Sequence, residues 1–137
     1  MATHTWSVLP ASPFTGPVKA LWLRIEELLP SGQVIKIVAD GTWSCFGATA
    51  CEPQGLVDLN FSSDQLILPD SPPGALVGKI GGSDSGRRDG TLFAIGRFCI
   101  LAPLEKRAPL FVTVNGIWRT GPFKFDQLTI TISTIDP

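Results

Sequence analysis

The chain has 137 residues, of which 44% are hydrophobic and 17% charged, with a formal net charge of −1. This length suits one domain with a substantial core, and the composition excludes a disordered chain. The near-neutral charge announces no basic surface, so nucleic acid is not an expected partner. No apolar run approaches the roughly 18–20 residues of a spanning helix, so no membrane span is expected.

The N-terminal residues, MATHTWSVLP, lack both the basic start and the long apolar run of a standard signal peptide. This favours the cytoplasm, or export by a route that leaves no such signal. Residues 1–17 contain three prolines and no sustained period. We therefore expect an irregular N-terminal arm over 1–17, pinned by Trp6 and Phe14, and a single β domain over 18–137.

Alternating apolar and polar residues predict strands from residue 18 onward. The segment VKALWLRIEELLP favours a strand with Trp22 in the core, although RIEELL also has helix propensity. QVIKIVADGTWSC alternates too, and its Asp40-Gly41 pair predicts a hairpin turn between two strands that bury Trp43. Further strands are expected in GALVGKIG, TLFAIG, RFCILA, APLFVTVNG and QLTITISTI.

Two segments are longer than simple connections require: 47–73, with one short strand at 56–59, and 116–126. About eight short strands, no long helix, and the 14 Gly and 12 Pro residues of a turn-rich chain predict an all-β fold. The expected architecture is an antiparallel β-sandwich of jelly-roll type. Loops cluster at the ends of such sandwiches, and ligands are held there.

Lys79 is the one charged residue in the apolar strand GALVGKIG, and we interpret it as a snorkelling lysine at a sheet margin. The three cysteines are Cys45, Cys51 and Cys99, and an odd count argues against a complete disulfide framework. Three reduced, partly buried thiols are the simpler interpretation, and a Cys45–Cys51 bridge is the alternative.

The succession GQVIKIVADGTWSCFG, EPQG, PPGALVGKIG, LFAIG, PLFVTVNG and LTITI resembles the PA-I-type galactose-binding lectins. The resemblance covers roughly residues 18–135. It implies a galactose-binding-like jelly roll that binds a galactose-type carbohydrate at one end of the sandwich. It also implies a calcium ion that bridges the protein and the sugar hydroxyls.

The resemblance places the sugar contacts on the two long loops. The stretch SSDQ takes the place of a His-Pro-x-Gln-like segment, and a neighbouring aspartate and glutamine can bind two adjacent hydroxyls. A solvated polar turn is the alternative interpretation of this stretch. Trp118 in the second loop can stack on the apolar face of a sugar. A lid over the sandwich end, or an oligomer contact, is the alternative role for Trp118. The expected carbohydrate-binding residues are Ser62, Asp64, Gln65, Asn115, Ile117, Trp118 and Thr120.

The resemblance implies calcium ligands from the carbonyls of Phe46 and Thr120, with Asp126 as a nearby substitute. The sequence departs from the family pattern at Gly116, which stands where the family has an aspartate, and at Phe123 and Lys124, which replace two asparagines. Because the number of carboxylates sets calcium affinity, these departures weigh against a calcium site. Replacement of the ion by the Lys124 ammonium is the alternative.

We expect no enzymatic activity, because the single histidine lies near the N-terminus, the chain has no tyrosine, and no nucleophile motif is present. The rival hypothesis is a structural or protein-interaction module that kept the fold and lost the sugar site. The segment GPFKFD, which puts two phenylalanines on a loop, supports that hypothesis. If the last strand lies at a sheet edge, pairing with a second copy would build a homo-oligomer.

Overall fold

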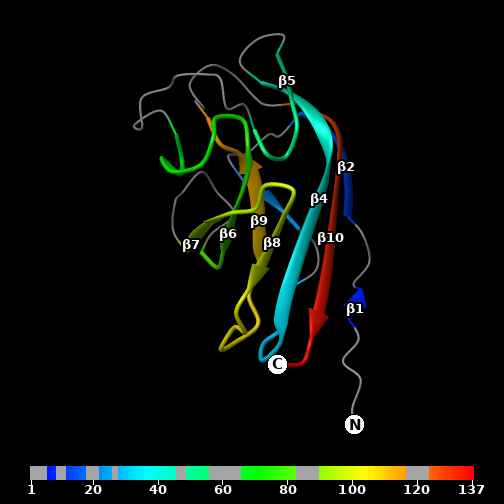
Figure 1. Ribbon diagram of the computed structural model, residues 1–137, viewed down its shortest axis with the longest axis vertical. Coiled ribbons are helices and arrows are strands. Elements are labelled where there is room, and N and C mark those ends of the chain that lie inside the picture. The colour runs from blue at the N-terminus through cyan, green and yellow to red at the C-terminus, as the bar shows by residue number, and fades with distance from the viewer. Residues whose placement is uncertain are drawn as a thin grey trace.

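The computed structural model describes residues 6–8, 12–17, 22–25, 28–45, 49–55, 66–82, 90–116 and 124–137; for 12–17, 44–45, 49–50 and 124–126 it describes the backbone alone. Two antiparallel sheets pack face to face in this part of the chain, which confirms the predicted all-β sandwich (Figure 1). Among the described residues, no helix has the length and apolarity to cross a membrane.

The first sheet, sheet A, is four strands wide, because two pairs of short strands share its edges. Strand β10 (Lys124–Ile135) pairs with β4 (Val34–Cys45) from Val34 to Ser44. On the far side of β10 lie β1 (Ser7–Val8) and β2 (Ser12–Pro17), and on the far side of β4 lie β5 (Thr49–Cys51) and β8 (Phe98–Leu101).

The second sheet, sheet B, has the order β3-β9-β6-β7. Its strands are β3 (Leu23–Arg24), β9 (Leu110–Val114), β6 (Leu76–Ile80) and β7 (Thr91–Ala94). Ten described strands therefore occupy eight positions in two sheets, where the sequence predicted about eight. The helix alternative for RIEELL finds no support, because β3 and the bridge between Leu29 and Ala108 are extended.

The predicted hairpin at Asp40-Gly41 is wrong, because β4 runs through both residues without turning. Next to them, opposite Thr42 and Trp43, β10 carries an extra residue: Phe125 faces Trp43 while Gln127 faces Thr42. Gly41 has a φ of +148°, and a Cβ at this position would lie 2.1 Å from the backbone oxygen of Gln127. The glycine thus serves a β-bulge with a close backbone approach and not a tight turn.

The expectation of an irregular arm over 1–17 is wrong for residues 7–8 and 12–17, which pair with β10. Trp6 does attach this segment to the domain, since the Lys36 Nζ lies 4.7 Å from the centroid of its ring. The division into arm and domain stays a prediction. With strands on both sides, β10 does not lie at a sheet edge, so the expected oligomer contact through it loses its premise.

The main core fills the space between the two sheets, and Trp43, Ile37, Leu76, Val112 and Ile130 are among its members. Sheet B is buried on its other face as well. There, a second cluster combines Trp22, Ile67, Val77 and Phe111. The prediction that Trp22 and Trp43 are core residues is confirmed, with 2% and 0% of each exposed.

Candidate functional site

Asn115 lies directly after β9, at the end of the sandwich where the predicted ligand loops were expected, and it is completely buried. Its Oδ1 accepts hydrogen bonds from the backbone N–H groups of Ile67 and Leu68, at 2.8 and 3.0 Å. Its Nδ2 donates to the carbonyls of Leu68, Ser71 and Pro72, at 3.0, 3.0 and 3.2 Å. Both polar atoms of the Asn115 side-chain amide are hydrogen-bonded to the main chain, so the side chain holds the segment 67–72 in place.

This fastened segment covers the outer face of sheet B. Ile67 is 3% exposed and belongs to the second cluster with Val77 and Phe111, and Leu68 packs against the same cluster. The backbone of Asn115 is tied as well: its N–H donates to the Ala75 carbonyl and its carbonyl accepts from Gly74. Asn115 therefore joins the last part of the first predicted loop, 47–73, to the chain directly before the second, 116–126.

The turn before β6 continues this anchor. The Ala75 N–H donates to the Pro72 carbonyl, and Gly74 has a φ of +79°, which is the geometry of a type II turn with proline and glycine at its two central positions. The Gly74 carbonyl accepts a 3.0 Å hydrogen bond from the buried indole of Trp43 in sheet A. The turn thus connects the two sheets at this end of the molecule.

The interpretation of Lys79 as a snorkelling lysine at a sheet margin is wrong. Strand β6 lies between β9 and β7, and Lys79 has no exposed surface. Its Nζ lies 4.7 Å from the centroid of the Phe111 ring and 5.2 Å from that of Trp22. The two rings provide cation–π contacts to the buried ammonium. Strand alternation put Lys79 on the correct face, but only the tertiary structure shows that this face is covered.

The other predicted site residues carry little structural information. Ser62, Asp64, Gln65, Ile117, Trp118, Thr120 and Phe46 lie outside the described residues, as does the expected strand at 56–59. Asp126, expected on a loop, has its backbone in β10 at the bulge. Among the described residues, no group of three or more His, Cys, Asp or Glu side chains is placed to hold a metal ion.

The cysteines differ from the interpretation as three reduced thiols. Cys51 is disulfide-bonded, while Cys99 is free and half-buried on β8. The side chain of Cys45, the expected partner, lies outside the described part. Burial of the Cys99 thiol raises its pKa to about 11 from an ordinary value of 9.0, although a backbone hydrogen bond with Ile37 opposes the shift.

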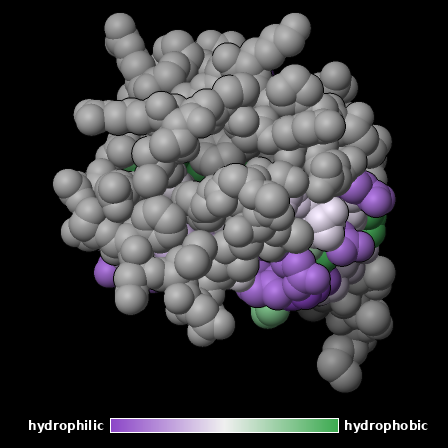
Figure 2. Space-filling model, turned by 90° about the horizontal axis from the view of Figure 1, so that it is seen from above, coloured by the Kyte–Doolittle hydropathy of each residue, from purple (hydrophilic) through white to green (hydrophobic). Residues whose placement is uncertain are grey.

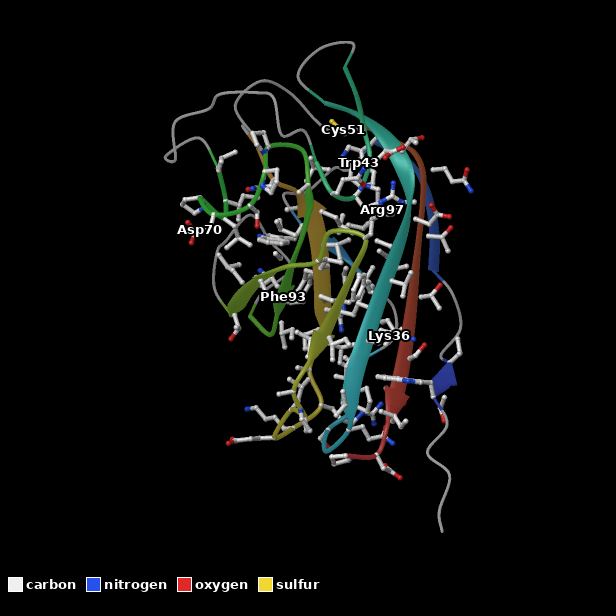
Figure 3. All side chains as sticks on the ribbon, viewed as in Figure 1. Lys36, Trp43, Cys51, Asp70, Phe93 and Arg97 are labelled. Atoms are coloured by element: carbon white, nitrogen blue, oxygen red, sulfur yellow. The ribbon has the colours of Figure 1, made fainter. Side chains whose placement is uncertain are left out.

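A polar pocket of about 200 Å³ opens at the outer edge of sheet A. It is lined by Asp40, Gly41, Thr42, Glu52, Arg97 and Gln127. One ion pair crosses it, with Arg97 Nη2 2.8 Å from Glu52 Oε2, and the Gln54 amide donates to the same oxygen. Arg97 lies beside the upper half of β4, below Trp43 and Cys51 (Figure 3).

Sequence reasoning missed this pocket. Asp40-Gly41 attracted attention only as a turn signal, and nothing in the pattern connects it with Glu52, Arg97 or Gln127. Figure 2 looks onto the loop end of the sandwich, and most of the hydrophilic described residues visible there lie on the side of β4 and β10. The residues of the pocket come from four separate stretches of the sequence, so only the folded chain brings them together.

Comparisons with known proteins identify the fold. No family model matches the chain, and no curated protein sequence matches it. Eight chains of solved structures do match. One of them is the EclA N-terminal domain, a PllA-like lectin, with a TM-score of 0.59 and 12% sequence identity over 93% of this chain and 97% of that domain. The chain therefore shares its β-sandwich fold with a PllA-like lectin domain.

Proposed function

We propose that this protein is a non-enzymatic carbohydrate-binding module of the lectin type. The observation that carries the proposal is the likeness to a PllA-like lectin over nearly the full length of both chains. Fold alone does not fix function, so the ligand and its site are argued from the residues. The resemblance of the sequence motifs to PA-I-type lectins supports a galactose-type ligand.

The proposed sugar site is the loop end of the sandwich, formed by residues 46–49, 62–65 and 115–126. The anchoring role of Asn115 supports this choice. Gln65 lies two residues before Ile67, the first residue that the Asn115 amide fastens, and Ile117 follows Asn115 by two residues. One buried side chain therefore limits how far the two proposed loops can separate, which reduces the conformational entropy lost on binding.

In this site, Asp64 and Gln65 bind two neighbouring sugar hydroxyls, and Trp118 stacks on the apolar face of the ring. Ser62, Ile117 and Thr120 line the same loops. Calcium is the cofactor of the PA-I-type lectins that the sequence resembles. In this chain its ligands would be Phe46, Thr120 and Asp126. We expect sugar binding without it, because Gly116 and Phe123 supply no oxygen ligand from a side chain and Lys124 carries a positive charge.

A glycan array probed once with calcium and once with a chelator tests the proposal. We expect galactosides to bind in both conditions and binding to fall in Asp64→Ala and Trp118→Ala. Asp136→Asn, which changes an exposed carboxylate near the C-terminus, is the matched control and should bind as the wild type does. Loss of binding on chelation would contradict calcium independence. The absence of binding to every glycan in both conditions would contradict the lectin assignment.

The second candidate, a protein-interaction module, has one specific observation in its favour. Phe98 and Ile100 on β8 are 63% and 58% exposed, and Val38 on β4, opposite Phe98, is 37% exposed. An exposed apolar strip of this kind suits a protein contact, including one with a second copy. Analytical sedimentation of the wild type and of Ile100→Glu tests this second function. An assembly that only the wild type forms, together with no binding to any glycan on the array, would favour a protein-interaction module.

A further inference from the structure

We propose that the polar pocket on sheet A is a second saccharide-binding site, in which Asp40, Thr42, Arg97 and Gln127 bind the hydroxyls of one neutral sugar ring. The inference rests on the proposed lectin function and adds a binding site to it. Four of its six lining residues, Asp40, Gly41, Thr42 and Gln127, belong to strands of sheet A, and Glu52 and Arg97 directly adjoin strands of that sheet.

The pocket exists because two short strands share one edge of β4. Strand β8 pairs with Ile35 to Val38, and β5 pairs with Trp43 to Cys45. The Ala39 N–H donates to the Arg97 carbonyl, and beyond it no described strand pairs with residues 40–42 of β4 on this side, which leaves a notch in the described part of sheet A. Glu52 enters the notch directly after β5, and Arg97 enters it directly before β8. Their 2.8 Å ion pair closes the notch on its outer side.

The bulge shapes the floor of this notch. Gly41 contributes no side chain, and a Cβ there would collide with the Gln127 carbonyl. Gln127 directly follows the extra residue of β10 and lies opposite Thr42, and both side chains are exposed. Bulges often occur beside binding sites, because they redirect strands and side chains locally. Here the bulge leaves a backbone floor flanked by an amide and a hydroxyl.

The chemistry of the lining suits a polyol. Asp40 accepts hydrogen bonds, the Arg97 guanidinium donates them, and Gln127 and Thr42 do both. Such a mixed set matches vicinal hydroxyl groups, each of which is both donor and acceptor. Two carboxylates and one guanidinium leave a local charge of −1, so the pocket disfavours anionic ligands.

An apolar surface adjoins the polar one. Phe98 is 63% exposed and lies opposite Val38, two residues before Asp40 on the same face of β4. Diagonal neighbours of this kind lie roughly 7–8 Å apart. A sugar ring has hydroxyls at its edge and an apolar C–H face, so a ring held at Asp40 can rest that face on Phe98.

The size and position of the pocket define the ligand further. Its 200 Å³ lies below the roughly 300–1,000 Å³ of pockets for drug-sized ligands, which favours a single sugar unit. Asp40 lies five steps along β4 from Cys45, roughly 17 Å, whereas Gln127 directly follows Asp126 of the proposed loop-end site, so the two proposed sites adjoin each other. A molecule with two adjoining sites can bind a branched or repeating glycan more tightly than either site alone.

Two-dimensional 1H–15N NMR titrations with methyl glycosides test the second site. The probes are the methyl pyranosides of galactose, glucose and mannose, with glucuronate as the anionic probe. We expect a neutral glycoside to shift the amides of Gly41, Thr42, Arg97 and Gln127 together. In Asp40→Asn and Gln127→Ala the apparent Kd from these shifts should rise by about tenfold, because hydrogen bonds to the sugar are lost.

Two further variants separate recognition from general damage. Asp136→Asn, the matched exposed carboxylate, should leave the pocket titration unchanged. Phe98→Ala should weaken the binding of every sugar that occupies the pocket. Glucuronate that binds there as tightly as the neutral glycosides would overturn the recognition scheme.

The outcomes distinguish this site from the proposed function. Shifts at the pocket whose apparent Kd rises about tenfold in Asp40→Asn, with or without shifts at Asp64, Gln65 and Trp118, support the second site. Shifts confined to those three loop residues overturn the second site and leave the lectin function intact. No shift anywhere with any neutral glycoside overturns both.

Discussion

Replacement of Asn115 by alanine tests how far one amide holds the loop end together. The substitution removes five hydrogen bonds, two accepted by Oδ1 and three donated by Nδ2. A typical hydrogen bond contributes about 1 kcal/mol net, and a buried group left unpaired costs about 1–3 kcal/mol. Some of the freed groups regain water when the segment loosens, so we expect the free energy of unfolding to fall by about 3–5 kcal/mol.

Chemical denaturation in urea measures this loss, and thermal unfolding should show a Tm lower by roughly 10–20 °C. Hydrogen exchange gives a local readout, because the amides of Ile67 and Leu68 lose their acceptor in the variant. They should lose more protection than the amides of β10.

Gln33→Ala is the matched control. It removes an amide that makes one exposed 2.9 Å hydrogen bond, to Asp136, and should cost less than about 0.5 kcal/mol. Asn115→Asp should destabilise at least as much as alanine, since it sets an oxygen against three carbonyl oxygens. A loss below about 1 kcal/mol in Asn115→Ala would refute the reasoning that this side chain anchors the segment.

Three further predictions concern the stability of two variants and the reactivity of one cysteine. Gly41→Ala should lower the free energy of unfolding by about 2 kcal/mol or more in urea titrations, because its Cβ meets the Gln127 carbonyl at 2.1 Å; a neutral effect would contradict the bulge. Thr113→Val should raise stability by about 1 kcal/mol, since among the described residues the buried Thr113 Oγ1 has no hydrogen-bond partner; destabilisation would show that the hydroxyl is satisfied. Cys99 should react with iodoacetamide at pH 8 on the order of 100-fold more slowly than a thiol with the ordinary pKa of 9.0, because a pKa of about 11 leaves less thiolate. The reaction rate should still rise with pH above pH 9, and a plateau of the rate there would contradict the raised pKa.

The sequence by itself determined the fold class and the positions of many strands along the chain. Local sequence pattern predicted β6, β7, β8 and β9, because strand-forming residues and the turn residues that bound them are adjacent in the sequence. Gly74 and Gly96 take their positive φ angles for an equally local reason, since glycine adopts these backbone angles without steric cost. Asn115 was singled out, but its work as an anchor depends on the segment 67–72, nearly fifty residues away.

The tertiary structure decided what depends on distant partners. Asp40-Gly41 has the local chemistry of a hairpin, yet pairing with β10 along eleven residues of β4 keeps it extended beside a bulge of β10. Lys79 resembles a margin residue until the second cluster covers it. The polar pocket combines residues 40–42, 52, 97 and 127, and no local pattern links them. Periodicity and turn propensity act over a few residues, whereas burial, register and the meeting of side chains depend on contacts between segments that are far apart in the chain.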